Sequence, residues 1–369
     1  TMIRWASSAP MLVLLRRFAG WKGRRRTRAL LKAFRPTVVI TTHPLPAMVV
    51  SELRRRGSLR VPAIESTTDP DPLPLLLCPH LDRLLVSTPM DVERVRASRP
   101  RLPVTAMSPP VAPAFTSSAS RSEARDRMGL ADETRTVILV SGGSWAVGGM
   151  REIVEAAAAP GDIRVLVLCA ENDKLREEIA SQFAAGHVDA LEFRSDMPDV
   201  IAAVDAVVHT GAGVTGFETL AVGTPLLIVN PIPGHGLRSA QALHEYGLAQ
   251  LFASVDDLMH LLRDPNQLRA ATTAQIAAGQ ALYDAPNAGE MIVSTPVRRR
   301  AQRRRVVGRR LVSLMSILIL TIIVSGIAAE SNNAFARRVG ERTHKVSCMP
   351  FHVHPLSGHN RVLWFARSC

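Results

Sequence analysis

The sequence predicts an α/β protein with two doubly wound parallel-sheet domains in tandem, followed by one membrane-spanning helix. From residue 37 onward, short apolar runs rich in β-branched residues alternate with helical stretches in two successive series. A proline-rich stretch at 100–113 separates the two series, and an uncharged run of 19 residues at 311–329 follows the second one. The length of 369 residues suits two domains, and the composition excludes collagen-like, disulfide-scaffold and wholly disordered proteins.

Residues 1–36 are the first element, a basic segment in which apolar pairs alternate with basic pairs. Nine Lys and Arg side chains and no acidic one lie between Arg16 and Arg35. On a helix this pattern gives one apolar face and one cationic face. Two interpretations remain open, a helix that lies in the interface of an anionic membrane or a surface helix packed on its own domain.

Residues 37–113 are expected to form the first domain. Strands are predicted at 37–42, 61–66 and 84–87, and helices at 47–56 and 91–97. Apolar strands that alternate with helices indicate a parallel sheet covered on both faces. Prolines and a polar run lead us to interpret residues 100–120 as a linker.

Residues 114–283 are expected to form the second domain. Strands are predicted at 136–141, 163–169, 190–193, 206–209 and 225–229. Helices are predicted at 149–158, 173–183, 197–202, 215–221, 256–262 and 267–282, with another that begins at 239.

The C-terminal part begins with an Arg-rich linker at 284–310, which carries eight Arg and no acid between Arg298 and Arg310. As a helix, the run at 311–329 would be roughly 28 Å long, close to the ~30 Å hydrocarbon core of a bilayer. The arginines before it place residues 1–310 in the cytoplasm and an extracytoplasmic tail at 330–369. The sequence thus predicts a single-pass protein of the cell membrane with both α/β domains in the cytoplasm.

The net charge of +13 arises from the two basic segments, because without their 17 cationic side chains the remaining chain carries a net charge of about −4. Basic segments bind nucleic acid or anionic lipid. The neighbouring apolar runs favour an anionic membrane surface as the partner. Since the arginines lack the interleaved aromatic residues of nucleic-acid binders, we expect no nucleic-acid partner, and cysteine spacing predicts no metal site.

Three glycine-rich loops follow strands of the second domain, and ligands of open parallel sheets bind beyond the carboxyl ends of the strands. The candidate binding residues in these loops are Gly142, Gly143, Ser144, His209, Gly211, Gly213, Thr215, Glu218, Gly234 and His235.

The residue types in these loops suit a nucleoside diphosphate. Glycines let backbone N–H groups approach an anion at a helix N-terminus, and His209 and Thr215 can add donors. Glu218, expected in the first turn of its helix, can accept hydrogen bonds from both hydroxyls of a ribose. Plainer interpretations remain open: a tight strand-to-helix turn for the first loop, a helix-dipole contact for Glu218, and a solvated side chain for His235.

The segment from Val137 to about Ala253 resembles the donor domain of the two-domain GT-B glycosyltransferases. It is most similar to the branch of monogalactosyl- and glucosyl-diacylglycerol synthases and the lipid II-forming peptidoglycan transferase. The resemblance is collinear and is carried by the SGG loop, LVLCAEND, SDMP, the GxG…E…LAxGxP stretch and LLIVNPIPG. In the first domain, PTVVITTHPLPAMVVSELRRRG and VPAIESTTD resemble the acceptor domain of the same branch.

The resemblance implies two Rossmann-like domains that transfer a hexose from a UDP-sugar to a membrane lipid hydroxyl, such as that of diacylglycerol, with inversion. No cofactor is implied besides the donor substrate. The diphosphate would lie on the glycine loops and His209, and the ribose on Glu218. The general base is expected from the first domain, where His43 and Asp69 follow strand ends. The plainer interpretation of His43 is a cap before a proline.

The chain departs from the resembled branch in two respects. The usual first strand and glycine-rich loop have no counterpart before residue 37, so we expect the first domain to be incomplete. His235 and Ser239 stand where the branch usually has Gln and Asn. Two alternative functions therefore remain, a catalytically impaired nucleotide-sugar-binding membrane protein and a transferase that acts on a polyprenyl-linked cell-wall precursor.

Overall fold

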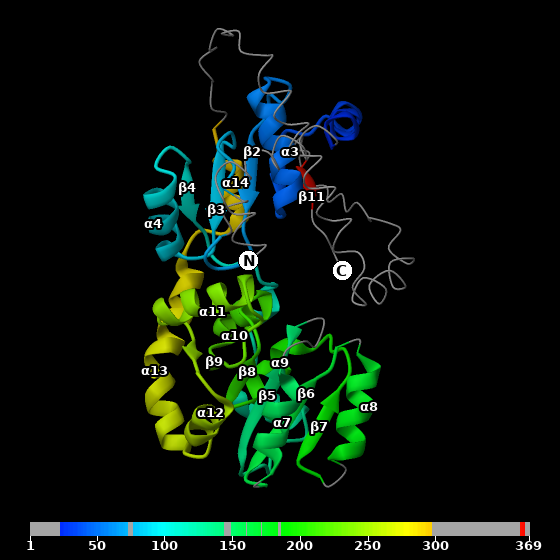
Figure 1. The fold of residues 1–369 in the computed structure, drawn as a ribbon, viewed down its shortest axis with the longest axis vertical. Coiled ribbons are helices and arrows are strands. Elements are labelled where there is room, and N and C mark those ends of the chain that lie inside the picture. The colour runs from blue at the N-terminus through cyan, green and yellow to red at the C-terminus, as the bar shows by residue number, and fades with distance from the viewer. Residues whose placement is uncertain are drawn as a thin grey trace, which may run out of the picture. The chain divides into compact units, whose positions relative to one another are not determined.

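The computed structural model describes residues 23–72, 77–143, 149–159, 161–170, 172–183, 186–296 and 362–365. Two parallel sheets organise these residues, as Figure 1 shows. One sheet has the strand order β11-β1-β2-β3-β4, and the other has the order β10-β9-β8-β5-β6-β7. The predicted α/β class with two parallel-sheet domains is confirmed.

The first sheet combines four strands from residues 38–106 with one distant strand. Its strands are β1 (Val38–Thr41), β2 (Ala63–Ser66), β3 (Arg83–Val86), β4 (Val104–Ala106) and β11 (Val362–Phe365). The helices of this part are α3 (Pro44–Arg55), α4 (Pro89–Ser98), α14 (Ala288–Val293) and a helix at 23–34.

Two helices pack on opposite faces of this sheet, because neighbouring residues of a strand point to opposite sides. On one face Val39 packs in a cluster with Met48 of α3. On the other face Ile40 and Ile64 pack in a cluster with Ile292 of α14. The strands are therefore apolar on both sides, as the sequence predicted.

The basic helix at 23–34 packs on the first domain. Leu31 lies against the cluster under α3, and a Cβ at Gly23 would lie 2.6 Å from Cγ2 of Val49. The exposed residues of this helix include Arg25, Arg26, Arg28 and Lys32. The arrangement supports the interpretation of a helix that packs on its own domain and turns a cationic face outward.

The predicted linker at 100–120 is wrong, because it contains β4, α5 (Pro113–Thr116) and the N-cap of α6 (Arg121–Arg127). The prolines around β4 suggested a break in the chain. An edge strand tolerates flanking prolines, since only one of its sides must pair. β4 pairs with β3 alone, and Pro103 contributes its carbonyl oxygen to Leu84 N at 2.8 Å.

The predicted linker at 284–310 is wrong over its first part, because α14 is a helix that packs on the first sheet. Arg83 of β3 donates to the carbonyl oxygen of Met291 at 3.1 Å, which fastens α14 to the start of β3. Six residues are too few for a helical period to stand out in the sequence.

The second sheet has β5 at its centre, with β8 on one side and β6 on the other. Its strands are β5 (Thr136–Ser141), β6 (Ile163–Leu168), β7 (Val188–Leu191), β8 (Ala206–His209), β9 (Leu226–Ile228) and β10 (Gln250–Leu251). Its helices are α7 (Met150–Ala158), α8 (Asp173–Gln182), α9 (Met197–Ala203), α10 (Val214–Val222), α11 (His235–Glu245), α12 (Val255–Leu262) and α13 (Pro265–Ala281), with the 3₁₀ helix η2 (Leu282–Asp284).

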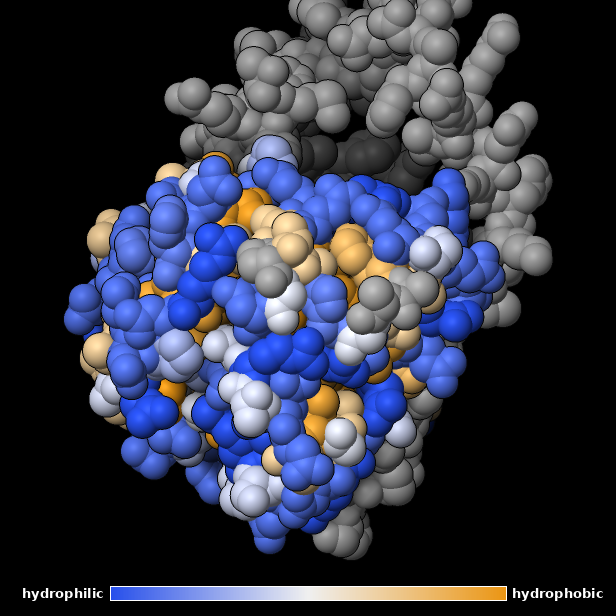
Figure 2. All heavy atoms as spheres, turned by 90° about the horizontal axis from the view of Figure 1, so that it is seen from below, coloured by the Kyte–Doolittle hydropathy of each residue, from blue (hydrophilic) through white to orange (hydrophobic). Residues whose placement is uncertain are grey.

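The second sheet is also buried on both faces. Residues Val137 to Val140 of β5 have no exposed surface, and they alternate between two hydrophobic clusters. On the side seen in Figure 2, hydrophilic residues predominate and hydrophobic ones form small separate groups among the coloured residues. The apolar residues are thus gathered inside the sheet layers rather than on that side.

The C-terminal predictions fall mostly outside the described residues. These include the proposed spanning helix at 311–329, and no helix within the described ranges is long and apolar enough to cross a membrane. β11 pairs in parallel with β1, with Val362 opposite Val38. A strand paired with β1 lies on the same side of a membrane as β1. For residues 362–365 this pairing is therefore at odds with the predicted extracytoplasmic tail.

Candidate functional site

The candidate site lies where the strand order of the second sheet reverses. β5 is followed in space by β6 on one side, whereas β8 flanks it on the other, which makes the β5/β8 boundary the topological switch point. Ser141 at the end of β5 is the register partner of His209 at the end of β8. The glycine loops that follow these two strands therefore start side by side.

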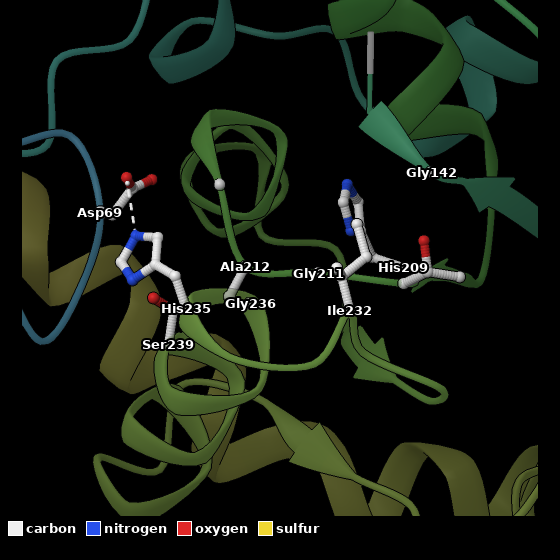
Figure 3. Close-up of a pocket in the computed structure, with 11 residues that line it drawn as sticks. Asp69, Gly142, His209, Gly211, Ala212, Ile232, His235, Gly236 and Ser239 are labelled. Atoms are coloured by element: carbon white, nitrogen blue, oxygen red, sulfur yellow. Dashed lines mark hydrogen bonds and ion pairs between the residues drawn. The ribbon is translucent and has the colours of Figure 1, made fainter. Parts of the chain in front are cut away.

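A pocket of about 280 Å³ occupies this place. It is lined by Asp69, Gly142, His209, Thr210, Gly211, Ala212, Gly213, Ile232, His235, Gly236 and Ser239. In Figure 3, Asp69, His235 and Ser239 lie at one side of the pocket and His209 and Gly142 at the other. The pocket thus brings together six predicted binding or catalytic residues from four strand-end segments.

His209 is the buried polar group of the pocket. Its side chain is 5% exposed, and neither ring nitrogen makes a regular hydrogen bond with another described residue. Burial lowers the pKa of the imidazole to about 4, and the adjacent Gly211 backbone offsets this only in part. At neutral pH the ring is uncharged, with one N–H donor and one acceptor, and a bound ligand can supply the missing partner.

The loop after β8 keeps backbone close to the imidazole. A Cβ at Gly211 would lie 3.5 Å from Nδ1 and Cε1 of His209, which is ordinary van der Waals contact, so the loop backbone runs directly beside the ring. Gly213 is the N-cap of α10, and no side chain caps this helix. Its first N–H groups thus have no side-chain cap as a competitor for an anion.

Thr215 and Glu218 do not line the pocket. Glu218 is the fifth residue of α10, so it begins the second turn and lies one residue beyond the predicted first turn. It is half-buried, and burial raises the pKa of its carboxyl while a hydrogen bond from Thr215 works against this. Tyr283 of η2 lies beside it and donates its hydroxyl to the carbonyl oxygen of Phe217 at 2.5 Å.

The loop after β9 turns sharply before α11. Gly234, the N-cap of α11, has φ 95° and ψ −115°, a conformation that only glycine adopts readily. The helix therefore begins at His235 rather than at the predicted Ser239. This early start places His235 and Ser239, one turn apart, on the same face of α11 and in the pocket wall.

The segment after β2 reaches the same helix. Nε2 of His235 lies 3.2 Å from Oδ2 of Asp69, and the hydroxyl of Ser239 donates to the carbonyl oxygen of Pro70 at 3.2 Å. Nε of Arg238 donates to Oδ2 of Asp71 at 3.0 Å. A loop of the first domain thus closes one side of the pocket.

Of the two predicted bases, the pocket contains Asp69 and not His43. His43 is the N-cap of α3, and its Nδ1 accepts a hydrogen bond from Leu45 N at 3.3 Å. The plainer interpretation of His43 as a helix cap is confirmed.

The remaining predicted residues lie near the pocket or outside the described chain. Gly143 has φ 73°, and its N–H donates to the hydroxyl of Ser141 at 3.3 Å. Gly143 and Gly234 neighbour the lining residues without lining the pocket themselves. Ser144 falls outside the described residues.

Five lining residues were not predicted: Thr210, Ala212, Ile232, Gly236 and Ser239. Four of them lie in the same loops as predicted residues, so the position of these loops at strand ends was the sequence feature that could have identified them. To predict Ser239 as a lining residue, the true start of α11 had to be known. The predicted helix began at Ser239 and so did not include the turn that joins this residue to His235. The described residues hold no group of three or more His, Cys, Asp or Glu that could bind a metal ion.

Comparison with known proteins gives related sequences for both domains. Residues 6–98 match the family model described as "Monogalactosyldiacylglycerol (MGDG) synthase". The "Processive diacylglycerol beta-glucosyltransferase" of Bacillus pumilus is 22% identical over 255 residues, which cover 67% of this chain and 66% of that protein. The protein of the same name from Bacillus cereus (strain 03BB102) is 22% identical over 267 residues, 70% of this chain and 65% of that protein. The chain thus spans just under two thirds of the length of these relatives.

Solved structures share the fold. Anabaena Alr3699/HepE in complex with UDP aligns with a TM-score of 0.52 and 15% identity, over 72% of this chain and 79% of that one. Os79 from O. sativa in complex with UDP gives a TM-score of 0.56 and 13% identity, over 74% and 81%. A glycosyltransferase from Rickettsia africae gives 0.50 and 10%, over 78% and 80%. The fold of this chain is therefore similar to that of these structures.

Proposed function

We propose that this chain is an inverting, UDP-sugar-dependent glycosyltransferase that moves a hexose to the hydroxyl of a membrane lipid, with diacylglycerol as the first candidate acceptor. The observation that carries the proposal is the pocket at the β5/β8 switch point, which is lined by Asp69 of the first domain, by glycines and by the neutral His209. The ring nitrogens of His209 have no hydrogen-bond partner among the described residues. The names of the matched relatives, which act on diacylglycerol, support the acceptor class.

The donor diphosphate would lie on the loops after β5 and β8. A neutral imidazole donates one N–H to a phosphate oxygen, and uncapped helix N–H groups and the helix dipole add to it. This set of donors stabilises the negative charge that develops on departing UDP without a metal ion. Glu218 remains the proposed ribose ligand, and it would reach the hydroxyls from the second turn of α10.

The proposed transfer is a single displacement. The acceptor hydroxyl oxygen forms a bond to the anomeric carbon of the sugar while the bond from that carbon to the β-phosphate oxygen breaks. The bonding electron pair leaves with UDP, and the hydroxyl proton passes to Asp69. Asp69 is favoured over His43 as the base because it lies in the pocket wall.

Exposed apolar residues around the pocket suit a lipid acceptor. Ile232 lines the pocket and is 43% exposed, and Val214 and Leu237 follow the lining residues Gly213 and Gly236 and are also exposed. Leu45 at the start of α3 is exposed as well, at the carboxyl end of β1. Large apolar side chains in water are favourable places for an acyl chain to bind.

The cationic face of the helix at 23–34 is the proposed contact with an anionic membrane surface. Arg24 of this helix lies within electrostatic reach of Arg55 and Arg56 at the end of α3, so the two helices contribute to one basic region. We propose that this region holds the chain at the cytoplasmic face of the cell membrane, where a lipid acceptor is available.

The test is transfer of radiolabelled sugar from UDP-glucose or UDP-galactose into extractable lipid, with diacylglycerol in anionic vesicles. We expect labelled glycolipid, and we expect His209→Gln to weaken UDP binding in calorimetry by about tenfold or more, because a hydrogen bond to a charged group is lost. His260→Gln, on the exposed side of α12, is the matched control and should bind UDP normally.

Each other outcome selects a different function. UDP binding without transfer to any lipid would establish the catalytically impaired nucleotide-sugar-binding protein. Transfer only to a polyprenyl-linked precursor would establish the cell-wall alternative. Absence of both UDP binding and transfer would overturn the proposal.

A further inference from the structure

The loop after β2 is held on α11 by three consecutive contacts. Arg238 pairs with Asp71, Ser239 bonds to the carbonyl oxygen of Pro70, and His235 contacts Asp69. The first two contacts fix the backbone and the far side of the loop. The His235–Asp69 contact is the one of the three in which both side chains line the pocket.

The contact joins one oxygen of Asp69 to one nitrogen of His235. A carboxylate oxygen only accepts hydrogen bonds, so Nε2 of His235 is the donor. Nδ1 is buried and has no partner among the described residues. The contact, drawn as a dashed line in Figure 3, uses Oδ2 of Asp69. The Asp69 side chain is 40% exposed, so one carboxylate oxygen is held while the other is left for a ligand.

We propose that His235 is a positioning residue for Asp69: by holding Oδ2, it directs the other carboxylate oxygen to the hydroxyl of the acceptor. This inference rests on the proposed function. It assigns the first residue of α11, on the sheet that carries the donor loops, a role in proton transfer from the acceptor.

The alternative is that His235 only helps to hold the loop. Arg238 provides the matched comparison, since it lies on the same helix, contacts the same loop and does not line the pocket. If His235 acts on the carboxylate, its removal lowers kcat far more than removal of Arg238 does. If it only holds the loop, the two losses are similar.

The experiment measures kcat, KM for the acceptor and UDP affinity in vesicles for the full chain. We expect His235→Ala to lower kcat by roughly tenfold to a hundredfold, with UDP affinity changed by less than about threefold. His235→Gln, whose amide nitrogen can take the place of Nε2, should recover most of the loss, whereas His235→Asn should not. Arg238→Gln should lower kcat by less than about threefold.

A double-mutant cycle decides whether His235 acts through Asp69. Asp69→Asn should lower kcat by roughly a hundredfold or more, and adding His235→Ala to it should cause no further loss. Additive losses, equal losses in His235→Ala and Arg238→Gln, or full activity of His235→Ala would each overturn the inference. The proposed function fails in a different way, because the unsubstituted chain would then transfer no sugar.

Discussion

His209 is the residue in which burial and function are most directly joined. An uncharged imidazole without a protein partner is unfavourable in a folded core unless something else uses its N–H and lone pair. The low pKa follows from the same burial, since a charged ring would have to lose its hydration. A neutral donor next to glycine N–H groups binds an anion without adding a titrating charge near neutral pH.

This burial predicts a pH dependence of stability. The pKa of His209 falls from 6.5 in the unfolded chain to about 4 in the folded one, so between these values the unfolded state binds more protons. Stability from this residue is complete above pH 6.5 and is lost as the pH falls toward 4. We expect about 2 kcal/mol of loss between pH 7.5 and pH 5. In urea unfolding, the His209→Asn variant should lose correspondingly less free energy of unfolding than the unsubstituted chain between pH 7.5 and pH 5.

The identity of the binding loops was readable from sequence, whereas their contacts were not. Gly142, Gly211 and Gly213 follow strand ends, and parallel sheets gather those ends at one edge, so local pattern was enough. The contact of His235 with Asp69 joins residues 166 positions apart through the packing of a loop on a helix. Glu218 shows the smaller error, because helix starts are set by caps that a sequence period does not locate.

At the scale of elements, α14 shows that a segment distant in sequence completes the core of the first sheet. It follows the second sheet in sequence, yet Ile292 packs with apolar residues from β1, β2 and β3 of the first sheet. Without α14 that face of the sheet would present Val38 and Ile40 to water. A short apolar helix in an otherwise polar stretch therefore has a larger role than its length suggests.

This packing predicts an effect of substitution in α14. Ile292 is 8% exposed, so Ile292→Ala should lower the free energy of unfolding by about 2–3 kcal/mol through lost burial and a cavity. Val293 is the next residue and is 73% exposed, so Val293→Ala should change it by less than about 0.5 kcal/mol. Equal effects of the two variants in guanidinium unfolding would show that α14 does not pack on the sheet in solution.

In the whole molecule, the cationic side chains proposed to contact the membrane lie apart from the pocket proposed to bind the donor. The described residues that line the pocket include no Lys or Arg, whereas the exposed face of the helix at 23–34 carries several. Anions that bind in the pocket meet N–H groups with fixed directions. An extended anionic surface instead meets long flexible side chains, whose attraction is not directional and is weakened by salt.

The cationic face predicts salt-dependent binding to anionic vesicles by residues 1–297, which omit the second arginine cluster and the apolar run after it. Each cation near such a surface contributes about 1 kcal/mol, so replacing Arg25, Arg26 and Lys32 by Gln should weaken binding to phosphatidylglycerol vesicles roughly a hundredfold. Replacing the exposed Lys174, Arg263 and Arg269 by Gln removes the same charge elsewhere and serves as the control. Co-sedimentation that is equal for both triple variants would show that the helix is only a packed surface helix.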